Sequence, residues 1–424
     1  MKTKKIIPTS LIFSILILLS CQGYKVTEKN TINQSNKIII GTIDSIFSKK
    51  LNEQREIWVY VPNEFNPFYG KKKYPVVYLL DGSSHFYSVV GLVDQFSMVN
   101  GNMVCPEMIV VGIPNTDRQR DLAPTIPDSS TTDPEILKNS CGGEMFTNFI
   151  EEELIPYIDK NYPTLPYRTL IGHSRGGLFA INTLIHRPYL FNNYIAIDPY
   201  LEWNKKWVVD ESRKLIGKTD FSKKSLYVSL SNFMEKEMKF TDIEKDTTQA
   251  TAYTRAILEF TKLAEANPQN KLNFKWKYYP DDDHGSVPLV SSIDAMHFLF
   301  SWYKFNMWNK ILDTTLVLEQ VKSMIENYSK TVSSHFGFEI NTSESLANTL
   351  GYYFLAYKRN EIVYYFFNMN IQNYPDSPNA YDAMGDYYLA QKDTALAIVN
   401  FKKSLSFGKR PFTIEKLKNL EKKK

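Results

Sequence analysis

The sequence of 424 residues predicts an α/β protein with a mostly parallel, doubly wound sheet, followed by a small all-α domain. Two patterns carry this prediction. Up to about residue 303, short apolar runs of strand length alternate with longer helical patterns, and beyond it no convincing strand is found. A composition of 43% hydrophobic, 23% charged and 14% aromatic residues is typical of an ordered globular protein and excludes disorder, collagen and coiled coil for the chain as a whole.

The first 21 residues predict a lipoprotein signal peptide. Three lysines lie within Met1–Lys5, and the apolar run Leu11–Leu19 is too short to span a membrane. The ending Leu18-Leu19-Ser20-Cys21 resembles a bacterial lipobox, in which the cysteine becomes the lipidated first residue of the mature protein. We therefore expect an exported protein, lipid-anchored to a bacterial membrane at the periplasmic face or cell surface, with residues 22–37 as a flexible tether. An uncleaved membrane anchor is the alternative.

Charge and cysteine content narrow the classes of partner. Fifty basic residues stand against 46 acidic ones, and the small net charge of +4 argues against a nucleic-acid partner. Export would place Cys105 and Cys141 in an oxidising compartment, where a disulfide and two free thiols are both open. No Cys/His spacing resembles a zinc site, so we expect neither a metal nor a cofactor.

Residues 38–303 contain eight segments of strand character. Ile38–Ile46 and Glu56–Val61 predict an antiparallel pair, because the second segment alternates between two faces. The other six are continuous apolar runs, which suit strands buried on both faces of a parallel sheet. These are Val76–Leu80, Met108–Ile113, Arg168–Ile171, Tyr194–Ile197, Leu226–Leu230 and Phe274–Tyr279. The helical patterns between them are Glu144–Lys160, Gly176–Ile185 and Thr247–Ala266. Together they predict a sheet with helices on both faces.

The C-terminal part repeats on itself at a period of 34 residues. Gly351 and Gly385 are 34 residues apart, and so are Phe367 and Phe401. This is the tetratricopeptide period, in which the glycine lets two antiparallel helices approach and an aromatic side chain fills the space. The domain is expected to comprise linking helices over 304–344, tetratricopeptide-like repeats over 345–411 and a basic tail over 412–424. The repeats either bind a protein partner or act only as a stabilising appendage.

The sequence Gly172-His173-Ser174-Arg175-Gly176-Gly177 lies between a predicted strand and a predicted helix. Gly-x-Ser-x-Gly in that context is a nucleophile elbow, whose strained turn lifts the serine hydroxyl above the sheet edge. Ser174 is therefore the predicted nucleophile, and a structural tight turn is the alternative. The N–H of Arg175 should supply one oxyanion donor, and the loop after Val76–Leu80 should supply the other through Gly82 or Ser83.

A serine hydroxyl needs a base, and in this arrangement the base follows the last strand. His284, directly after Phe274–Tyr279, is the predicted general base. The acid that orients it is expected after Leu226–Leu230, where Glu235 is the first choice and Glu237 the second; Asp198, after the preceding strand, is the third, and a Ser-His dyad remains open. His173 is expected to point away from the site, and His85 is a candidate for its lining.

With these motifs and the Leu80-Asp81-Gly82 loop, residues 38–303 resemble the putative esterase family of α/β-hydrolases. Further motifs are Arg118, Arg120 and Asp121 after the strand Val111-Gly112-Ile113, and Asp283-His284-Gly285. The family includes enterobactin-type siderophore esterases, feruloyl and acetyl-xylan esterases and esterase-D-like enzymes. The resemblance implies an α/β-hydrolase fold with Ser174 as nucleophile and His284 as base. The sequence departs from the pattern at Ile197-Asp198-Pro199, where a serine-proline pair is expected, and this leaves the acid open.

The function predicted from the sequence is a membrane-tethered serine esterase that acts through an acyl-serine intermediate. Its substrate would be a small-molecule or polysaccharide-linked ester, either a siderophore lactone or a feruloyl or acetyl polysaccharide ester. The alternative from another class is a catalytically disabled hydrolase-fold scaffold, whose repeats bind a partner protein.

Overall fold

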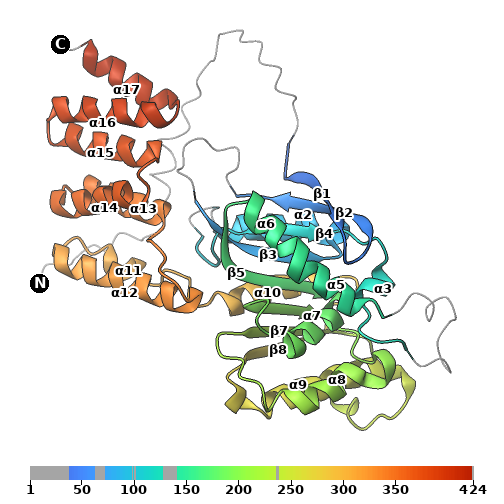
Figure 1. Cartoon of the computed structure of the whole chain (residues 1–424). Coiled ribbons are helices and arrows are strands. Elements are labelled where there is room, and N and C mark those ends of the chain that lie inside the picture. The colour runs from blue at the N-terminus through green and yellow to red at the C-terminus, as the bar shows by residue number, and fades with distance from the viewer. Residues whose placement is uncertain are drawn as a thin grey trace, which may run out of the picture. The chain divides into compact units, whose positions relative to one another are not determined.

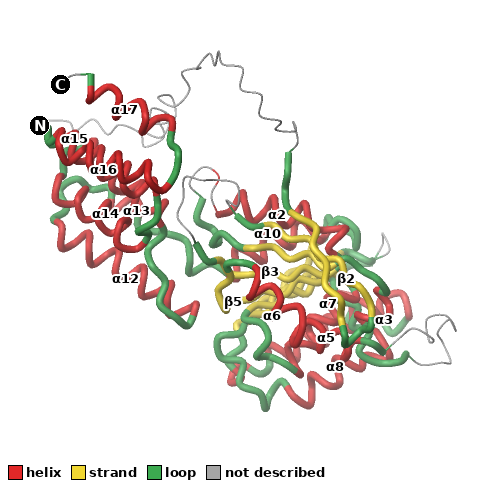
Figure 2. The backbone as a smooth tube through the Cα atoms, turned by 45° about the horizontal axis from the view of Figure 1, so that its top comes forward, coloured by secondary structure: helices red, strands yellow, loops and turns green. Residues whose placement is uncertain are grey.

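The computed structural model describes residues 38–62, 72–97, 99, 102–127, 141–234 and 238–422. The signal peptide with Cys21 and the tether over 22–37 lie outside the described residues, so these assignments stay predictions. Within the described part, one sheet of eight strands has the order β1-β2-β4-β3-β5-β6-β7-β8. Helices lie on both of its faces (Figures 1 and 2).

All eight predicted strands are present. They are β1 (Thr42–Ser48), β2 (Glu53–Tyr60), β3 (Tyr74–Leu80), β4 (Ile109–Ile113), β5 (Thr164–His173), β6 (Asn193–Ile197), β7 (Ser225–Ser231) and β8 (Asn273–Tyr279). β1 pairs antiparallel with β2, and β2 pairs antiparallel with β4, while the pairs from β4 through β3 to β8 are parallel. The carboxyl ends of the six parallel strands therefore meet at one edge of the sheet, where open α/β sheets bind their ligands.

Helices cover both faces of this sheet. On one face lie α2 (Gly82–Ser97) and α10 (Val287–Leu299). On the other lie α5 (Gly143–Phe149), α6 (Ile155–Asn161), α7 (Arg175–His186), α8 (Trp203–Leu215) and α9 (Ala252–Glu265). The single helix predicted over Glu144–Lys160 is interrupted by a π-helical turn at Ile150–Leu154.

The buried side chains of the central strands alternate between the two faces. Val76, Tyr78 and Leu80 pack with α5 to α9, whereas Val77 and Leu79 pack with α2 and α10. Every residue of β3 is buried. Because both faces are covered by helices, such a strand is a continuous apolar run rather than an alternating one.

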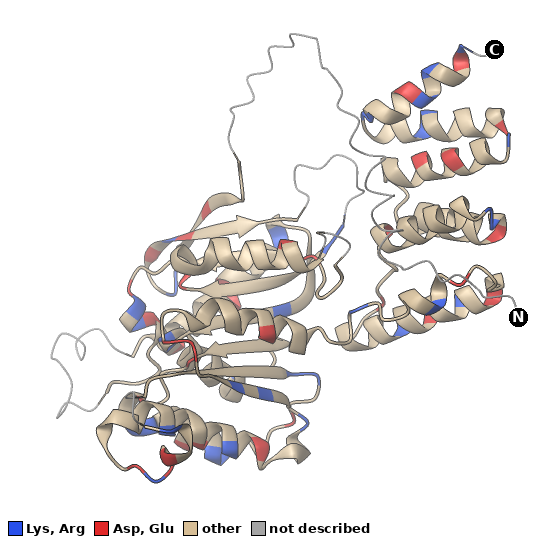
Figure 3. Ribbon diagram, turned by 180° about the vertical axis from the view of Figure 1, so that it is seen from behind, with Lys and Arg blue, Asp and Glu red and all other residues tan. Residues whose placement is uncertain are grey.

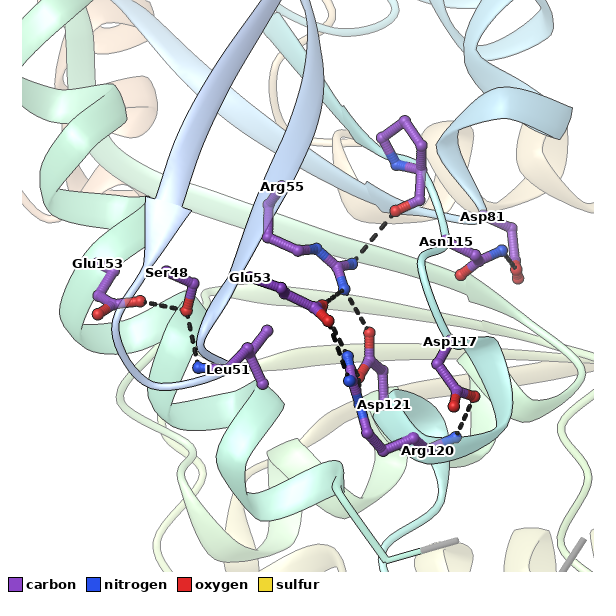
Figure 4. Close-up of polar contacts among 11 residues, drawn as sticks. Ser48, Leu51, Glu53, Arg55, Asp81, Asn115, Asp117, Arg120, Asp121 and Glu153 are labelled. Carbon is purple, nitrogen blue, oxygen red and sulfur yellow. Dashed lines mark hydrogen bonds and ion pairs between the residues drawn. The ribbon is translucent and has the colours of Figure 1, made fainter. Parts of the chain in front are cut away.

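A buried ionic cluster fastens the short helix α3 (Arg118–Leu122) to β2 (Figure 4). Arg55, only 1% exposed, donates to Asp121 at 2.6 Å and to the carbonyl of Pro114 at 3.2 Å. Arg120 donates to Asp121 at 2.7 Å and bridges to Glu53 at 2.7 and 3.0 Å. Removing one partner would leave a buried charge uncompensated, so the cluster fixes α3 against the sheet.

The C-terminal part is all helical, as predicted. Its helices are α11 (Trp308–Ile311), α12 (Leu318–Phe336), α13 (Glu344–Ala356), α14 (Asn360–Asn373), α15 (Pro378–Ala390), α16 (Thr394–Phe407) and α17 (Pro411–Glu421). α13 packs on α14, and α15 on α16 (Figure 1). A Cβ on Gly351 would lie 2.2 Å from the ring of Phe367, and one on Gly385 would lie 2.4 Å from Phe401. The glycines thus admit the aromatic rings as expected, while the tetratricopeptide identity stays a prediction.

Lys and Arg are interspersed with Asp and Glu along the described helices and strands (Figure 3). In this part of the chain, no helix has the length and apolar character that a membrane crossing needs. Cys105 is buried and Cys141 is exposed, and both are free thiols in the structure.

We predict that Gly351→Ala lowers the free energy of unfolding by about 1–3 kcal/mol, because the added methyl group overlaps the buried ring of Phe367. The matched control is Gly91→Ala on helix α2, where nothing lies within 4 Å of the added atom. There the gain in helix propensity should leave stability unchanged or raise it by up to about 1 kcal/mol. Chemical denaturation followed by circular dichroism measures both variants, and equal effects would contradict the packing argument.

Candidate active site

The predicted elbow lies where β5 ends and α7 begins. Ser174 joins them with φ 58° and ψ −113°, a left-handed conformation that is strained for serine. A Cβ on Gly172 would lie 2.1 Å from the carbonyl oxygen of Gly176, so only glycine permits this close crossing. The N–H of Ser174 donates to the carbonyl of Ile197 at 2.9 Å, which ties the turn to β6.

His284 is held by a buried carboxylate. Its Nδ1 lies 2.6 Å from Oδ2 of Asp198, whose side chain is 0% exposed. Ser231 donates to the same carboxylate through its N–H at 2.9 Å and its hydroxyl at 2.6 Å. With the carboxylate ionised, Nδ1 of His284 is the donor and Nε2 is free to accept a proton. Geometrically, this is the orienting acid and general base of a hydrolytic triad.

Asp198 lies where the orienting acid is expected. Glu235 and Glu237 lie outside the described residues, whereas Asp198, the third of the alternatives, already accepts the hydrogen bond from His284. Asp198 directly follows β6, the strand that pairs with β5, so its side chain emerges at the carboxyl edge beside the elbow. In the sequence, Asp198 is the residue that stands where the family pattern has the serine of a serine-proline pair.

The expectation that His173 points away from the site is wrong. Its ring centroid lies 4.4 Å from that of His284, and on its other side the ring of His85 meets it edge-on at 5.7 Å. Burial, followed by the positive charges that His284 and His85 can carry, lowers the pKa of His173 to about 4. His173 is thus neutral at neutral pH. His85 and His173 line a small void between β3, β5 and α10, while a place for His85 in the lining of the active site stays a prediction.

Among the described residues, no hydrogen bond joins the Ser174 hydroxyl to another side chain in this structure. The hydroxyl of an elbow serine commonly engages its base only once substrate is bound. Nucleophile and base both belong to the carboxyl edge of the sheet, because His173 precedes Ser174 and packs against His284.

The loop after β3 lies against the elbow, where the second oxyanion donor is expected. Gly82 and Ser83 are the first two residues of α2, whose first-turn N–H groups have no acceptor within the helix. Asp81 accepts from Arg118 at 2.5 and 3.0 Å and from Asn115 at 2.7 Å. Burial alone would raise the pKa of the Asp81 carboxyl, but the bonds from Arg118 and Asn115 outweigh it and lower that pKa.

Arg118 also connects this loop to the elbow, because its Nη2 donates to the carbonyl of His173 at 3.2 Å. The Arg118 side chain therefore holds the loop that begins α2 at a fixed distance from the turn of Ser174. The oxyanion roles of the N–H groups of Arg175, Gly82 and Ser83 stay predictions. The sequence did not predict that Arg118 pairs with Asp81, although both residues lie in motifs that the chain shares with the esterase family.

Aromatic side chains surround the acid–base pair. Phe233 and Tyr253 meet the ring of His284 edge-on, at 5.6 and 6.0 Å between centroids. Tyr200 stacks on Tyr253 at 5.7 Å, and Trp203 follows at 6.0 Å from Tyr200. These four side chains form an aromatic wall, in which Phe233 is 49% exposed while Trp203 is 4% exposed and backs the others. Trp207, which follows Tyr200 and Trp203 in the sequence, does not join this group and stacks on His186.

Comparison with known proteins places this chain among esterases. The model of the Putative esterase family matches residues 48–309. Ferri-bacillibactin esterase BesA from Bacillus subtilis (strain 168) is 28% identical over 222 residues, which cover 48% of this chain and 74% of the relative. The siderophore enterobactin esterase of Emericella nidulans is 28% identical over 235 residues, covering 50% and 77%. The crystal structure of an IroE-like serine hydrolase from Shewanella oneidensis has a TM-score of 0.58 at 24% identity and covers 87% of this chain and 100% of its own, so the two share a fold.

We predict that Asp198→Asn slows labelling of Ser174 by a fluorophosphonate on the order of a thousandfold or more, because the amide no longer holds His284 as a base. Glu235→Gln is the matched control and should stay within about twofold of the unchanged chain, since the acid position is already filled. Labelling rates read by mass spectrometry decide between the two acids. The reverse pattern would return Glu235 to that role.

Proposed function

The chain belongs to the Putative esterase family, and from this membership we propose that it is a siderophore esterase, which opens a carboxylic ester bond of a siderophore outside the cytoplasm. It is a serine esterase by family and by fold. The observation that carries the mechanism is the 2.6 Å contact between His284 and the fully buried Asp198, beside the elbow of Ser174.

In the proposed first step, Nε2 of His284 accepts the proton of the Ser174 hydroxyl while the oxygen attacks the ester carbonyl. Asp198 stabilises the imidazolium that forms, and Ser231 keeps the carboxylate in place. The negative charge that develops on the carbonyl oxygen meets the N–H of Arg175 and that of Gly82 or Ser83. One such donor typically contributes about a hundred- to thousandfold in kcat.

In the second half, His284 returns the proton to the leaving alcohol, and the acyl group remains on Ser174. His284 then removes a proton from water, which attacks the acyl carbonyl. The bond between Ser174 Oγ and the acyl carbon breaks, the acid leaves, and His284 returns the proton to Ser174. The proposed chemistry uses the side chains and backbone N–H groups of this chain, together with water. His173, neutral because of its burial, adds no charge that would compete with the imidazolium of His284.

The relatives favour a siderophore over a polysaccharide ester. The two relatives described above are named as esterases of ferri-bacillibactin and of the siderophore enterobactin. The aromatic wall of Tyr200, Trp203, Phe233 and Tyr253 suits an aromatic acyl group, because flat rings pack on aromatic faces. Feruloyl and acetyl polysaccharide esters are the competing substrates in the assay below.

We also propose that the enzyme is exported and lipid-anchored through Cys21. The support is the order of a basic start, a short apolar run and the lipobox-like ending Leu18-Leu19-Ser20-Cys21. A single acyl chain binds membranes only marginally, so the stable anchor would use more than one chain on the same cysteine. Such a tether would hold the esterase where an incoming siderophore is found.

We predict that Ser174→Ala abolishes hydrolysis of the siderophore enterobactin, followed by chromatography of the ring-opened products, because the alanine cannot form the acyl intermediate. Folding should be unchanged, as thermal unfolding of the variant verifies. Turnover of feruloyl and acetyl esters by the unchanged chain is measured in parallel. A variant that keeps roughly a tenth or more of the rate would remove Ser174 from the mechanism. Faster turnover of the polysaccharide esters would instead reassign the substrate.

We predict that Cys21→Ala moves the full-length protein from the membrane fraction to the soluble fraction, since the acyl acceptor is lost. Fractionation of cells with immunodetection measures the distribution. The control is Cys141→Ala, which removes an exposed thiol from the described part and should leave fractionation unchanged. Membrane association that persists in Cys21→Ala would indicate an uncleaved apolar anchor.

A further inference from the structure

The residue after the nucleophile is an arginine whose side chain lies against two of the aromatic residues near the site. Arg175 lies with its guanidinium carbon 4.9 Å from the ring centroid of Trp203 and 5.9 Å from that of Tyr200. Its Nη1 donates to Oε1 of Gln119 at 2.6 Å. Gln119 belongs to α3, which the buried pair of Arg55 and Asp121 fastens to the sheet. The guanidinium is therefore held in a defined position.

Arg175 has no carboxylate partner among the described residues. By contrast, Arg118 is paired with Asp81, and Arg187, the residue that follows α7, is paired with both Glu144 and Glu151. A guanidinium has five N–H donors, and Gln119 takes one of those on Arg175. The remaining donors can bind a ligand.

The surroundings of Arg175 make an uncompensated cation costly. Burial, and then the nearby charge of Arg118, lower the pKa of Arg175, although an arginine remains protonated at neutral pH. The faces of Trp203 and Tyr200 attract the cation but do not neutralise it. A half-buried positive charge that is braced on two aromatic rings is best satisfied by an anion that arrives with the substrate.

We propose that Arg175 selects aromatic acyl esters that carry a negative charge close to the scissile carbonyl. The inference rests on the proposed esterase function and specifies its substrate class. The nucleophile and Arg175 are consecutive residues, with Cα atoms about 3.8 Å apart, so the charge recognised must lie within one side-chain length of the reacting carbon. The aromatic part of the acyl group would pack against Phe233, which is 49% exposed and lies 5.6 Å from the ring of His284.

A purely structural role for Arg175 makes a different prediction. If the cation only braced Trp203, its loss would weaken the wall for every substrate and lower thermal stability. Recognition of an anion changes the discrimination between two substrates instead. The test therefore uses two esters that differ only in charge.

The experiment compares kcat/KM for the 4-nitrophenyl monoester of isophthalic acid, which carries a free carboxylate, with that for the 4-nitrophenyl ester of 3-carbamoylbenzoic acid, its neutral isostere. The full-length protein is assayed unchanged and as Arg175→Gln and Arg175→Lys. The matched control is Arg187→Gln, the same change just beyond the end of α7 at a guanidinium that already has two acidic partners. The readout is the ratio of the two kcat/KM values, anionic over neutral.

We expect the unchanged enzyme to prefer the anionic ester, and Arg175→Gln to lower the ratio by roughly ten- to a hundredfold, as loss of a charged hydrogen bond does. Arg175→Lys should keep part of the preference, and Arg187→Gln all of it. A ratio that is unaltered in Arg175→Gln, with both rates reduced alike, overturns the inference but leaves the esterase intact. If the folded, unchanged enzyme turns over neither ester and Ser174 takes no fluorophosphonate, the proposed function fails and the inference fails with it.

Discussion

The close crossing of two backbone segments at Gly172 and Gly176 is the constraint on which the whole site depends. No Cβ fits between them, so the chain leaves β5 in a left-handed turn and enters α7 at once. Such strain persists only where the surroundings over-determine it, and β5 lies inside the sheet between β3 and β6. Because of this turn, three consecutive side chains point in different directions. The His173 ring packs against His284, Ser174 lies at the carboxyl edge of the sheet, and the Arg175 side chain contacts Trp203 and Tyr200.

The charges near this turn follow one rule with one exception. Buried carboxylates are each matched by a donor of fixed geometry: Asp198 by His284 and Ser231, Asp81 by Arg118, and Asp121 by Arg55. Matched pairs of this kind hold loops in place at little net gain in stability, because desolvation offsets their attraction. The exception is Arg175, which has no acidic partner in the described part of the chain. In a binding site, a charged side chain without a protein partner can be neutralised by a ligand of opposite charge.

The strands, the elbow and the base were predictable because each depends on neighbours in sequence. An apolar run as short as Tyr194–Ile197 already indicates a buried strand, and Gly172 to Gly176 indicates the turn by spacing alone. The acid depends on which loops meet across the sheet edge, since Asp198 and His284 are 86 residues apart. Chain order pointed to the loop after β7, whereas the hydrogen bond came from the loop after β6. The packing of His173 on His284 was hidden for the same reason, because sequence does not give the direction of a side chain in a strained turn.

The helical part is joined to the same strand that carries the elbow, but at its other end. Tyr167, near the start of β5, meets Phe336 of α12 edge-on at 4.8 Å, and Val332 belongs to the same apolar cluster. Seven residues of strand, on the order of 20 Å, separate Tyr167 from Ser174. An element that packs on the amino end of β5 supports the strand without reaching the carboxyl edge where the chemistry takes place. The attachment through α12 therefore supports the sheet at the end of β5 opposite to Ser174.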